Sequence, residues 1–161
     1  MHLLGGLNLN KKILLALSIA VVAIAAVGTV SAFDLGALFG FPADQHVTMD
    51  GENFTIPGTM KEELNASVNG TEKDYVVFKS KEYGKRYLND TNYININISD
   101  YNTSDLDDNM VNFMNGTSKD VSGVKGYLYH DDYGYTYTYN KGSKVIAVQS
   151  DNEKLIGPVI A

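Results

Sequence analysis

The feature that most constrains this chain is an uncharged apolar run near its start. Residues 13–30 read ILLALSIAVVAIAAVGTV. As an α-helix with a rise of 1.5 Å per residue, this run is about 27 Å long, close to the thickness of the hydrocarbon core of a bilayer. It has no continuous polar face, so a buried helix of a soluble domain is the weaker interpretation. We therefore expect a membrane-inserted helix at residues 13–32, with residues 1–12 preceding it.

The flanks of this run predict its orientation. Lys11 and Lys12 directly precede it, so the positive-inside rule keeps residues 1–12 cytoplasmic and places the rest of the chain outside. The tripeptide Val30-Ser31-Ala32 also fits a signal-peptidase site, and cleavage after Ala32 would give a secreted protein. The length of the run favours an anchor over a signal peptide. We expect a single-pass protein of the cell membrane, with a connector at residues 33–45 and an extracytoplasmic domain at residues 46–161.

Charge and cysteine content exclude several classes of function. All 19 acidic residues lie from Asp34 onward, and the chain contains no cysteine. An acidic domain is repelled by phosphate backbones, so we expect no nucleic-acid partner. The lack of cysteine excludes disulfides, cysteine-based zinc sites and thiolate catalysis. We expect no cofactor.

Acceptor sequences for N-glycosylation are unusually frequent. Asn-x-Ser/Thr occurs seven times, several times more often than the composition predicts, and proline is never the middle residue. An Asn-rich and Thr-rich composition is the competing explanation, and one site lies within a predicted strand (Asn97). The seven asparagines are Asn53, Asn65, Asn69, Asn89, Asn97, Asn102 and Asn115.

Local patterns predict an α+β domain. Asp50-Gly51 between two short alternating runs indicates a β-hairpin, and Asn69-Gly70 indicates a further turn. Residues 93–98 alternate isoleucine with polar residues, as a half-buried strand does, whereas residues 104–115 have helical spacing. Further strands are predicted at 75–78, 83–88, 124–129, 133–139 and 144–149, a helical turn at 60–64, and a short closing helix at 152–160. The expected fold is an N-terminal transmembrane helix, then a β-rich domain with a mostly antiparallel sheet of six to seven strands and one or two packed helices.

A stripe of tyrosines is the strongest candidate for a binding surface. Tyr133, Tyr135, Tyr137 and Tyr139 alternate strictly and therefore share one face of a strand. Exposed, they would form an aromatic platform for sugars or for another strand. A turn at Lys141-Gly142 would instead place Tyr137 opposite Ile146 and Tyr135 opposite Val148, as in a buried face, and this second interpretation is favoured.

The other candidate motifs predict neither a metal site nor a catalytic site. Residues 100–108 carry oxygen ligands at alternate positions, but they lack the glycine and the terminal glutamate of a calcium loop. Capping of the predicted helix explains them more simply. Ser122-x-x-Lys125, Lys141-Gly142-Ser143 and Ser150-Asp151-Asn152 echo serine penicillin-binding enzymes, but in the wrong order. His46 and His130 are too far apart to suggest a metal pair.

Three segments carry a resemblance. GENFTIP, GYLYHDDYGYTYTYNKGSKVIAVQS and the terminal DNEKLIGPVI are similar to a group of small membrane-anchored extracellular proteins of methanogenic archaea. The resemblance covers most of residues 46–160 and implies a location and a fold, but no catalytic residue. The predicted strand order is also similar to the PsbP/Mog1-type sandwich, which is a likeness of fold alone.

These observations favour a non-enzymatic cell-surface domain that binds a glycan, a wall polymer or a protein. The alternative is a structural or accessory subunit of a membrane or envelope complex. An enzyme is the least favoured class.

Overall fold

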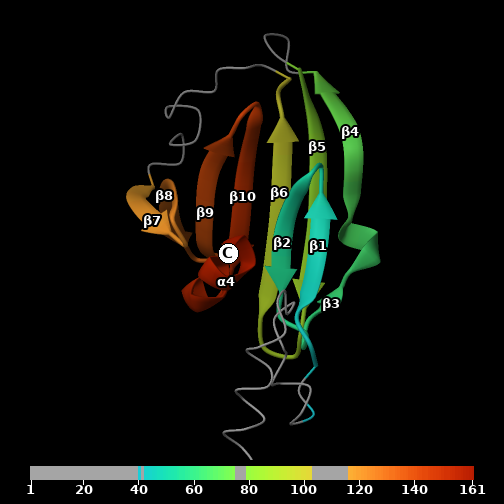
Figure 1. Cartoon of the computed structure of the whole chain (residues 1–161), viewed down its shortest axis with the longest axis vertical. Helices are drawn as coiled ribbons and strands as arrows, with labels where there is room; N and C mark the ends of the chain where they lie inside the picture. Colours follow the sequence, from blue (N-terminus) through green and yellow to red (C-terminus); the bar gives the residue numbers. More distant parts are fainter. Residues whose placement is uncertain (1–39, 41, 75–78, 103–115) are drawn as a thin grey trace, which may run out of the picture.

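A computed structural model describes residues 40, 42–74, 79–102 and 116–161 (Figure 1). These residues form two antiparallel sheets. The smaller is a hairpin of β1 (Gln45–Met49) and β2 (Glu52–Ile56). The larger has eight strands in the order β3-β5-β6-β10-β9-β8-β7, with β4 pairing with β5 beside β3. The domain is therefore β-rich and mostly antiparallel, as predicted, but with more strands.

The remaining elements follow in chain order. The strands are β3 (Lys61–Glu62), β4 (Val68–Asp74), β5 (Lys79–Leu88), β6 (Tyr93–Asp100), β7 (Thr117–Val121), β8 (Val124–Asp131), β9 (Gly134–Lys141) and β10 (Lys144–Ser150). Two short 3₁₀ helices are η1 (Leu64–Ala66) and η2 (Glu153–Leu155), and the chain closes with α4 (Ile156–Ile160).

Several predicted elements lie outside the described residues: the anchor at 13–32, the strand at 75–78 and the helix at 104–115. Within the described part, no helix has the length and apolarity that a membrane span requires.

Two hairpins turn on the same backbone geometry. Asp50 and Gly51 have φ values of 46° and 78°, and Ser122 and Gly123 have values of 53° and 78°. Positive φ at both central residues defines the type I′ turn, which matches the twist of paired strands. The first hairpin was predicted. The second, between β7 and β8, was missed because the sequence TSKDV of β7 is polar and does not alternate.

Three local predictions were wrong. Asn69-Gly70 is a bulge within β4, where the register shifts between Asn69 and Thr71, and not a turn. The predicted helical turn at 60–64 is instead β3 followed by η1. The turn between β9 and β10 is Gly142-Ser143, because Lys141 pairs with Lys144.

The different turn position changes the pairing register of β9 and β10, but each side chain stays on the predicted face of the sheet. Tyr137 lies opposite Val148 and Tyr139 opposite Ile146, two residues from the predicted partners. Because side chains alternate with a period of two, a shift of two residues leaves each side chain on its original face.

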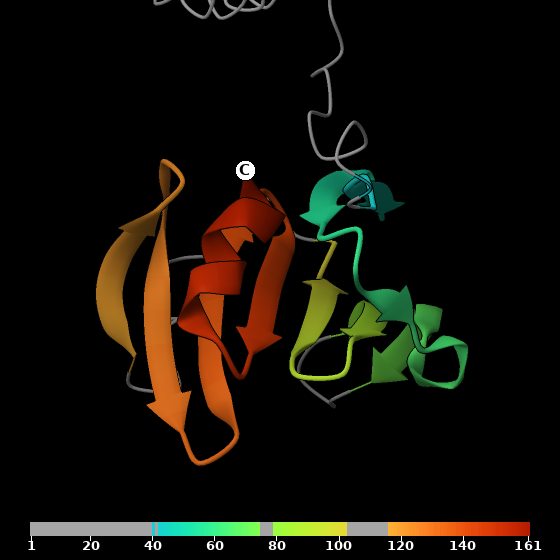
Figure 2. The same ribbon diagram turned by 90° about the horizontal axis from the view of Figure 1, so that it is seen from below.

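The core lies on one side of the large sheet, here called the inner face. Hairpin β1–β2 and α4 both pack on this side (Figure 2). The sheet contributes Ile94, Ile96 and Ile98 from β6 together with Ile146 and Val148 from β10, all fully buried. The covering elements contribute Met49, Phe54, Ile56, Ile156 and Val159.

A charged cluster fixes the tip of hairpin β1–β2 to the sheet. The Lys144 ammonium lies 3.2 Å from a carboxylate oxygen of Asp50 and 3.4 Å from one of Glu52. Glu52 also pairs with Lys141 at 2.6 Å. Burial alone would lower the pKa of Lys144, but the hydrogen bonds and charges of Asp50 and Glu52 raise it above its usual value.

A second set of contacts, the hairpin clasp, closes the open end of β1–β2. The Gln45 side-chain amide donates to the Met60 carbonyl oxygen at 2.7 Å, and the Gly58 N–H donates to Asp44 Oδ1 at 3.1 Å. Gly58 is required here, because a Cβ on it would lie 2.2 Å from the carbonyl oxygen of Ala43. The clasp therefore joins the start of β1 to the chain that follows β2.

Candidate functional site

The tyrosine stripe belongs mainly to the core. Tyr137 is fully buried and Tyr139 is 6% exposed, whereas Tyr135 is half-buried and stacks on His130 with ring centroids 4.2 Å apart. The Tyr137 hydroxyl lies within hydrogen-bonding distance of two backbone carbonyl oxygens and donates its proton to them. These oxygens belong to Lys119, at 2.9 Å, and Val124, at 2.6 Å. The core interpretation is therefore the correct one for Tyr137 and Tyr139, and these two cannot form a surface platform.

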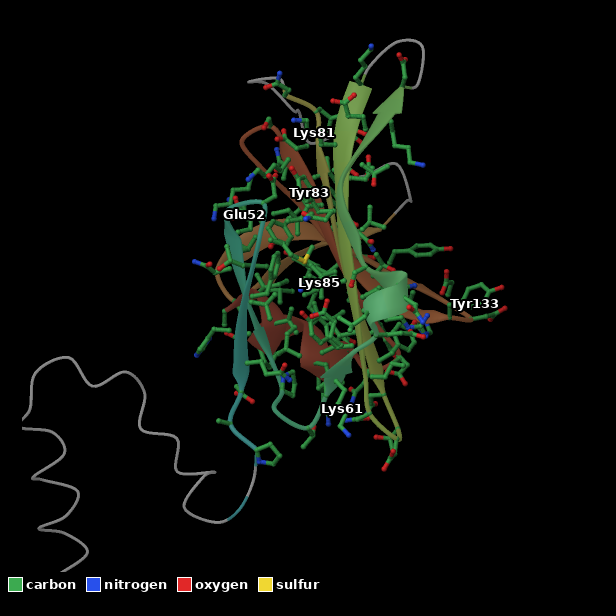
Figure 3. The ribbon with its side chains drawn as sticks, turned by 90° about the vertical axis from the view of Figure 1, so that its right-hand side faces the viewer. Glu52, Lys61, Lys81, Tyr83, Lys85 and Tyr133 are labelled. Carbon is green, nitrogen blue, oxygen red and sulfur yellow. The ribbon has the colours of Figure 1, made fainter. Side chains whose placement is uncertain are left out.

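Tyr133 is the exception within the stripe. It lies in the turn between β8 and β9, is 77% exposed, and projects from the side of the sheet opposite hairpin β1–β2 (Figure 3). Its backbone carbonyl accepts a hydrogen bond from the Tyr93 hydroxyl. Tyr133 is thus attached to the outer face of the sheet, on which neither hairpin β1–β2 nor α4 packs.

A row of polar side chains crosses this outer face. Pairing across five adjacent strands places these residues side by side: Arg86 (β5), Asn95 (β6), Gln149 (β10), Thr136 (β9) and Tyr129 (β8). We call them the polar row. Adjacent strands lie about 4.8 Å apart, so the row is about 19 Å long. Thr136 is 9% exposed, and the other four are half-buried.

The polar row is only partly satisfied by its own hydrogen bonds. The Asn95 amide donates to Gln149 Oε1 at 3.0 Å. In the described part of the chain, the buried Asn95 Oδ1 has no hydrogen-bond partner, whereas Arg86 Nε is held by its ion pair with Glu63. Buried polar atoms are usually paired, so the unpartnered oxygen of Asn95 distinguishes the row from an ordinary solvated surface.

One end of the polar row adjoins an aromatic ring. The Arg86 guanidinium lies 5.4 Å from the centroid of the Tyr93 ring, and its Nε lies 3.3 Å from a Glu63 carboxylate oxygen. Burial, followed by the charge of Asp151, raises the pKa of Tyr93. The raised pKa is consistent with a hydroxyl that keeps its proton and donates it to the Tyr133 carbonyl oxygen.

Beside the polar row, the outer face has small residues on both sides of Asn97. Asn97 is exposed at the centre of the outer face, between Gly84 of β5 and Ala147 of β10. Glycine and alanine are the smallest residues, so the positions on either side of Asn97 carry at most one methyl group. Further along the face, Val145 is buried against Tyr101 and Tyr127.

The candidate glycosylation sites are distributed over much of the surface. Asn53, Asn65, Asn69, Asn97 and Asn102 are exposed and Asn89 is half-buried, whereas Asn115 lies outside the described residues. Asn97, doubtful because of its strand position, is exposed on the outer face.

The remaining motifs have local structural roles. Ser122 lies in the β7–β8 turn and its hydroxyl donates to the Gly157 carbonyl at 2.8 Å. Asp100 Oδ1 accepts from the Asn102 N–H at 3.0 Å and from the Ser143 hydroxyl at 2.6 Å. No group of three or more histidine and carboxylate side chains within the described ranges is placed to hold a metal ion.

The chain matches no protein-family model, no curated protein and no solved structure. The resemblance to archaeal membrane-anchored proteins thus stays a prediction. Sequence reasoning missed the polar row because its members come from five strands far apart in the chain. The alternation of Asn95 and Asn97 with isoleucines was the only signal that pointed to this face.

Proposed function

We propose that this chain is a membrane-anchored cell-surface protein whose extracytoplasmic domain binds a glycan without catalysis. The polar row on the outer face is the proposed contact surface. The observation that carries the proposal is the row itself: amide, guanidinium and phenol groups lie side by side, and the buried side-chain oxygen of Asn95 has no hydrogen-bond partner within the described chain.

The chemistry of the row suits a sugar polymer. Carboxamide and guanidinium groups offer paired donors and acceptors to neighbouring hydroxyls, and tyrosine rings offer flat apolar area with a polar edge. The length of the row, about 19 Å, is that of an extended ligand rather than of a single small molecule. A surface of this kind needs no deep cavity, because contact is spread along the strands.

The proposed location rests on the sequence. The uncharged run at residues 13–32 and the two lysines before it predict export and anchoring, and cleavage after Ala32 would release the same domain. The excess of N-glycosylation acceptors agrees with export.

Binding can be tested with purified protein and soluble oligosaccharides of neutral hexoses and N-acetylhexosamines, monitored by NMR chemical shifts. We expect shifts at Asn95, Gln149 and Arg86, and at least a tenfold loss of affinity in Gln149→Ala, about 1.4 kcal/mol. Thr48→Ala is the matched control, because Thr48 is an exposed hydroxyl on the hairpin. Shifts confined to other surfaces, or equal affinity in both variants, would refute this site.

Asn97 provides a second test of the same site. A glycan attached to Asn97 would cover the surface beside the polar row and exclude another ligand. We therefore expect peptide mass spectrometry of the mature protein to find Asn97 unmodified. An occupied Asn97 would contradict the proposal. If no oligosaccharide binds and a protein co-purifies instead, the accessory-subunit alternative is supported.

A further inference from the structure

A tight turn at one end of the sheet holds another acceptor asparagine in a fixed orientation. Asn89 begins the connection between β5 and β6, and its side-chain oxygen accepts three hydrogen bonds. The donors are the Thr91 N–H at 3.0 Å, the Thr91 hydroxyl at 3.2 Å and the Asn92 N–H at 2.8 Å. The Asn89 N–H also donates to the Asn92 carbonyl oxygen at 3.0 Å.

These bonds identify which side-chain atom is the nitrogen. Two of the three donors are backbone N–H groups, so only an oxygen can face them. Nδ2 must therefore face away from the turn, and it makes no hydrogen bond with the described chain. Among the six described acceptor asparagines, only Asn89 has its side-chain oxygen bonded to backbone N–H groups.

A groove lies beside this asparagine. Its volume is about 820 Å³, and Asn89 and Thr91 both line it. The other walls are Thr59, Lys61, Glu62, Glu63, Leu88 and Asp90. The groove thus offers the aliphatic surface of Leu88, a hydroxyl from Thr59 and the exposed ammonium of Lys61 (Figure 3). The other acceptor asparagines of the described chain do not line this groove.

We infer that Asn89 carries an N-linked glycan and that the first sugar of this glycan lies in the groove. The inference rests on export of the domain, which is part of the proposed function. It does not require the polar row to bind a ligand.

The attachment chemistry leaves the turn intact. Asn89 Nδ2 forms a bond to the anomeric carbon of an oligosaccharide carried on a lipid phosphate. The bond from that carbon to the phosphate oxygen breaks, the lipid phosphate leaves with the electron pair, and Nδ2 loses one proton. Oδ1 is unchanged, so its three hydrogen bonds persist and continue to orient the modified side chain.

Two variants separate the glycan from the turn. Thr91→Ser keeps the acceptor sequence and the hydroxyl. Thr91→Ala removes the acceptor sequence but keeps the backbone N–H groups that bond to Asn89. In the full chain from a host with N-glycosylation, we expect Asn89 to be modified in the parent protein and in Thr91→Ser, and bare in Thr91→Ala, by peptide mass spectrometry.

Release by an endoglycosidase under native conditions tests the groove. We expect the glycan at Asn89 to be released about tenfold more slowly than that at Asn53, because it must first leave the groove. Lys61→Ala should speed release at Asn89 without changing its occupancy. Release at equal rates would overturn the groove contact.

The outcomes also separate this inference from the proposed function. A bare Asn89 in a protein modified at Asn53 or Asn65 overturns the inference alone. A protein bare at all seven sites overturns the inference and also removes the support that the acceptor sequences give to export.

Discussion

The two faces of the large sheet come from the same strands and carry opposite chemistry. On β10, Ile146 and Val148 face the hairpin and the closing helix, whereas Ala147 and Gln149 face outward. On β6, three isoleucines face inward and Asn95 and Asn97 outward. The inner face is buried and mainly apolar, with the Tyr137 hydroxyl bonded to backbone carbonyl oxygens and the Tyr87 hydroxyl without a hydrogen-bond partner among the described residues. The outer face instead carries a row of half-buried polar side chains, among them Arg86, Asn95 and Gln149.

This difference indicates how the sheet divides its roles. The inner face supplies stability through buried apolar area, which allows the outer face to carry groups that contribute little to folding. Substitutions on the inner face should therefore change stability, and substitutions on the outer face should change binding. Substitutions on the two faces test this division, and we expect the largest effect from the buried core.

Removal of a buried ring should give the largest loss. Tyr137→Ala deletes a fully buried ring and the hydroxyl proton that it donates to backbone carbonyl oxygens. We expect the free energy of unfolding to fall by about 4 kcal/mol. Denaturant unfolding followed by circular dichroism measures this loss. A loss below about 1 kcal/mol would mean that the inner face is not the core.

The next largest effect should come from glycine-to-alanine substitutions, which should lower the free energy of unfolding more on the inner face than on the outer face. A Cβ on Gly126 would lie 2.5 Å from the Thr138 carbonyl oxygen and 2.8 Å from the Tyr137 ring, so Gly126→Ala should cost about 3 kcal/mol. A Cβ on Gly84 would lie 3.1 Å from the exposed Asn97 side chain and in ordinary contact, at 3.7 Å, with the Val68 side chain. Gly84→Ala should cost less than about 1 kcal/mol in the same unfolding assay. Equal losses would remove the distinction between the faces.

The charged cluster at the hairpin tip should contribute a smaller, pH-dependent amount. Lys144→Met should cost about 2 kcal/mol near pH 8, whereas Lys141→Met, at a side chain 67% exposed, should cost less than about 0.5 kcal/mol. The pKa of Lys144 is raised in the folded protein. Its stabilisation is therefore complete below the unfolded pKa of about 10.4 and is lost as pH rises through the folded value.

Unfolding curves at a series of pH values check this sign. The difference between the parent protein and Lys144→Met should shrink above about pH 10.4. A difference that grows with pH would show that Lys144 does not hold the hairpin through its charge.

The outer face should show the smallest effect on stability. Gln149→Ala removes a half-buried amide and its hydrogen bond to Asn95, and should change the free energy of unfolding by about 0.5 kcal/mol. The same variant is expected to lose oligosaccharide affinity. If it unfolds the domain instead, the polar row is part of the framework and not a contact surface.

Local chemistry made much of the sheet predictable. The hairpin at Asp50-Gly51 needs only two residues that tolerate positive φ, and the alternation at 93–98 needs only the strand period. The register of β9 and β10 was missed because glycine can occupy either position of a two-residue turn. Here Gly142 is the first, with φ of 61°. The pairing of β6 with β10 joins residues about fifty positions apart, and no local pattern encodes it.

The same reason separates the predictable from the unpredictable part of the site. Tyr137 could be assigned to an alternating face from its neighbours alone. The polar row requires the order of five strands, because Arg86 and Tyr129 become members of one row only through the three strands between them. The groove beside Asn89 likewise needs the position of β3 next to the end of β5.

The hairpin clasp determines how the domain would respond to tension. A pull arriving from the N-terminal side enters the fold at β1, at the open end of the hairpin. The ladder bonds of a hairpin loaded at that end break one after another, which resists force poorly. The contacts of Asp44 with Gly58 and of Gln45 with Met60 cross this end, so the load passes directly into the segment leading to β3 and the sheet. In a domain tethered by its N-terminal side, force would therefore reach the eight-stranded sheet without first separating β1 from β2, the hairpin that covers the core.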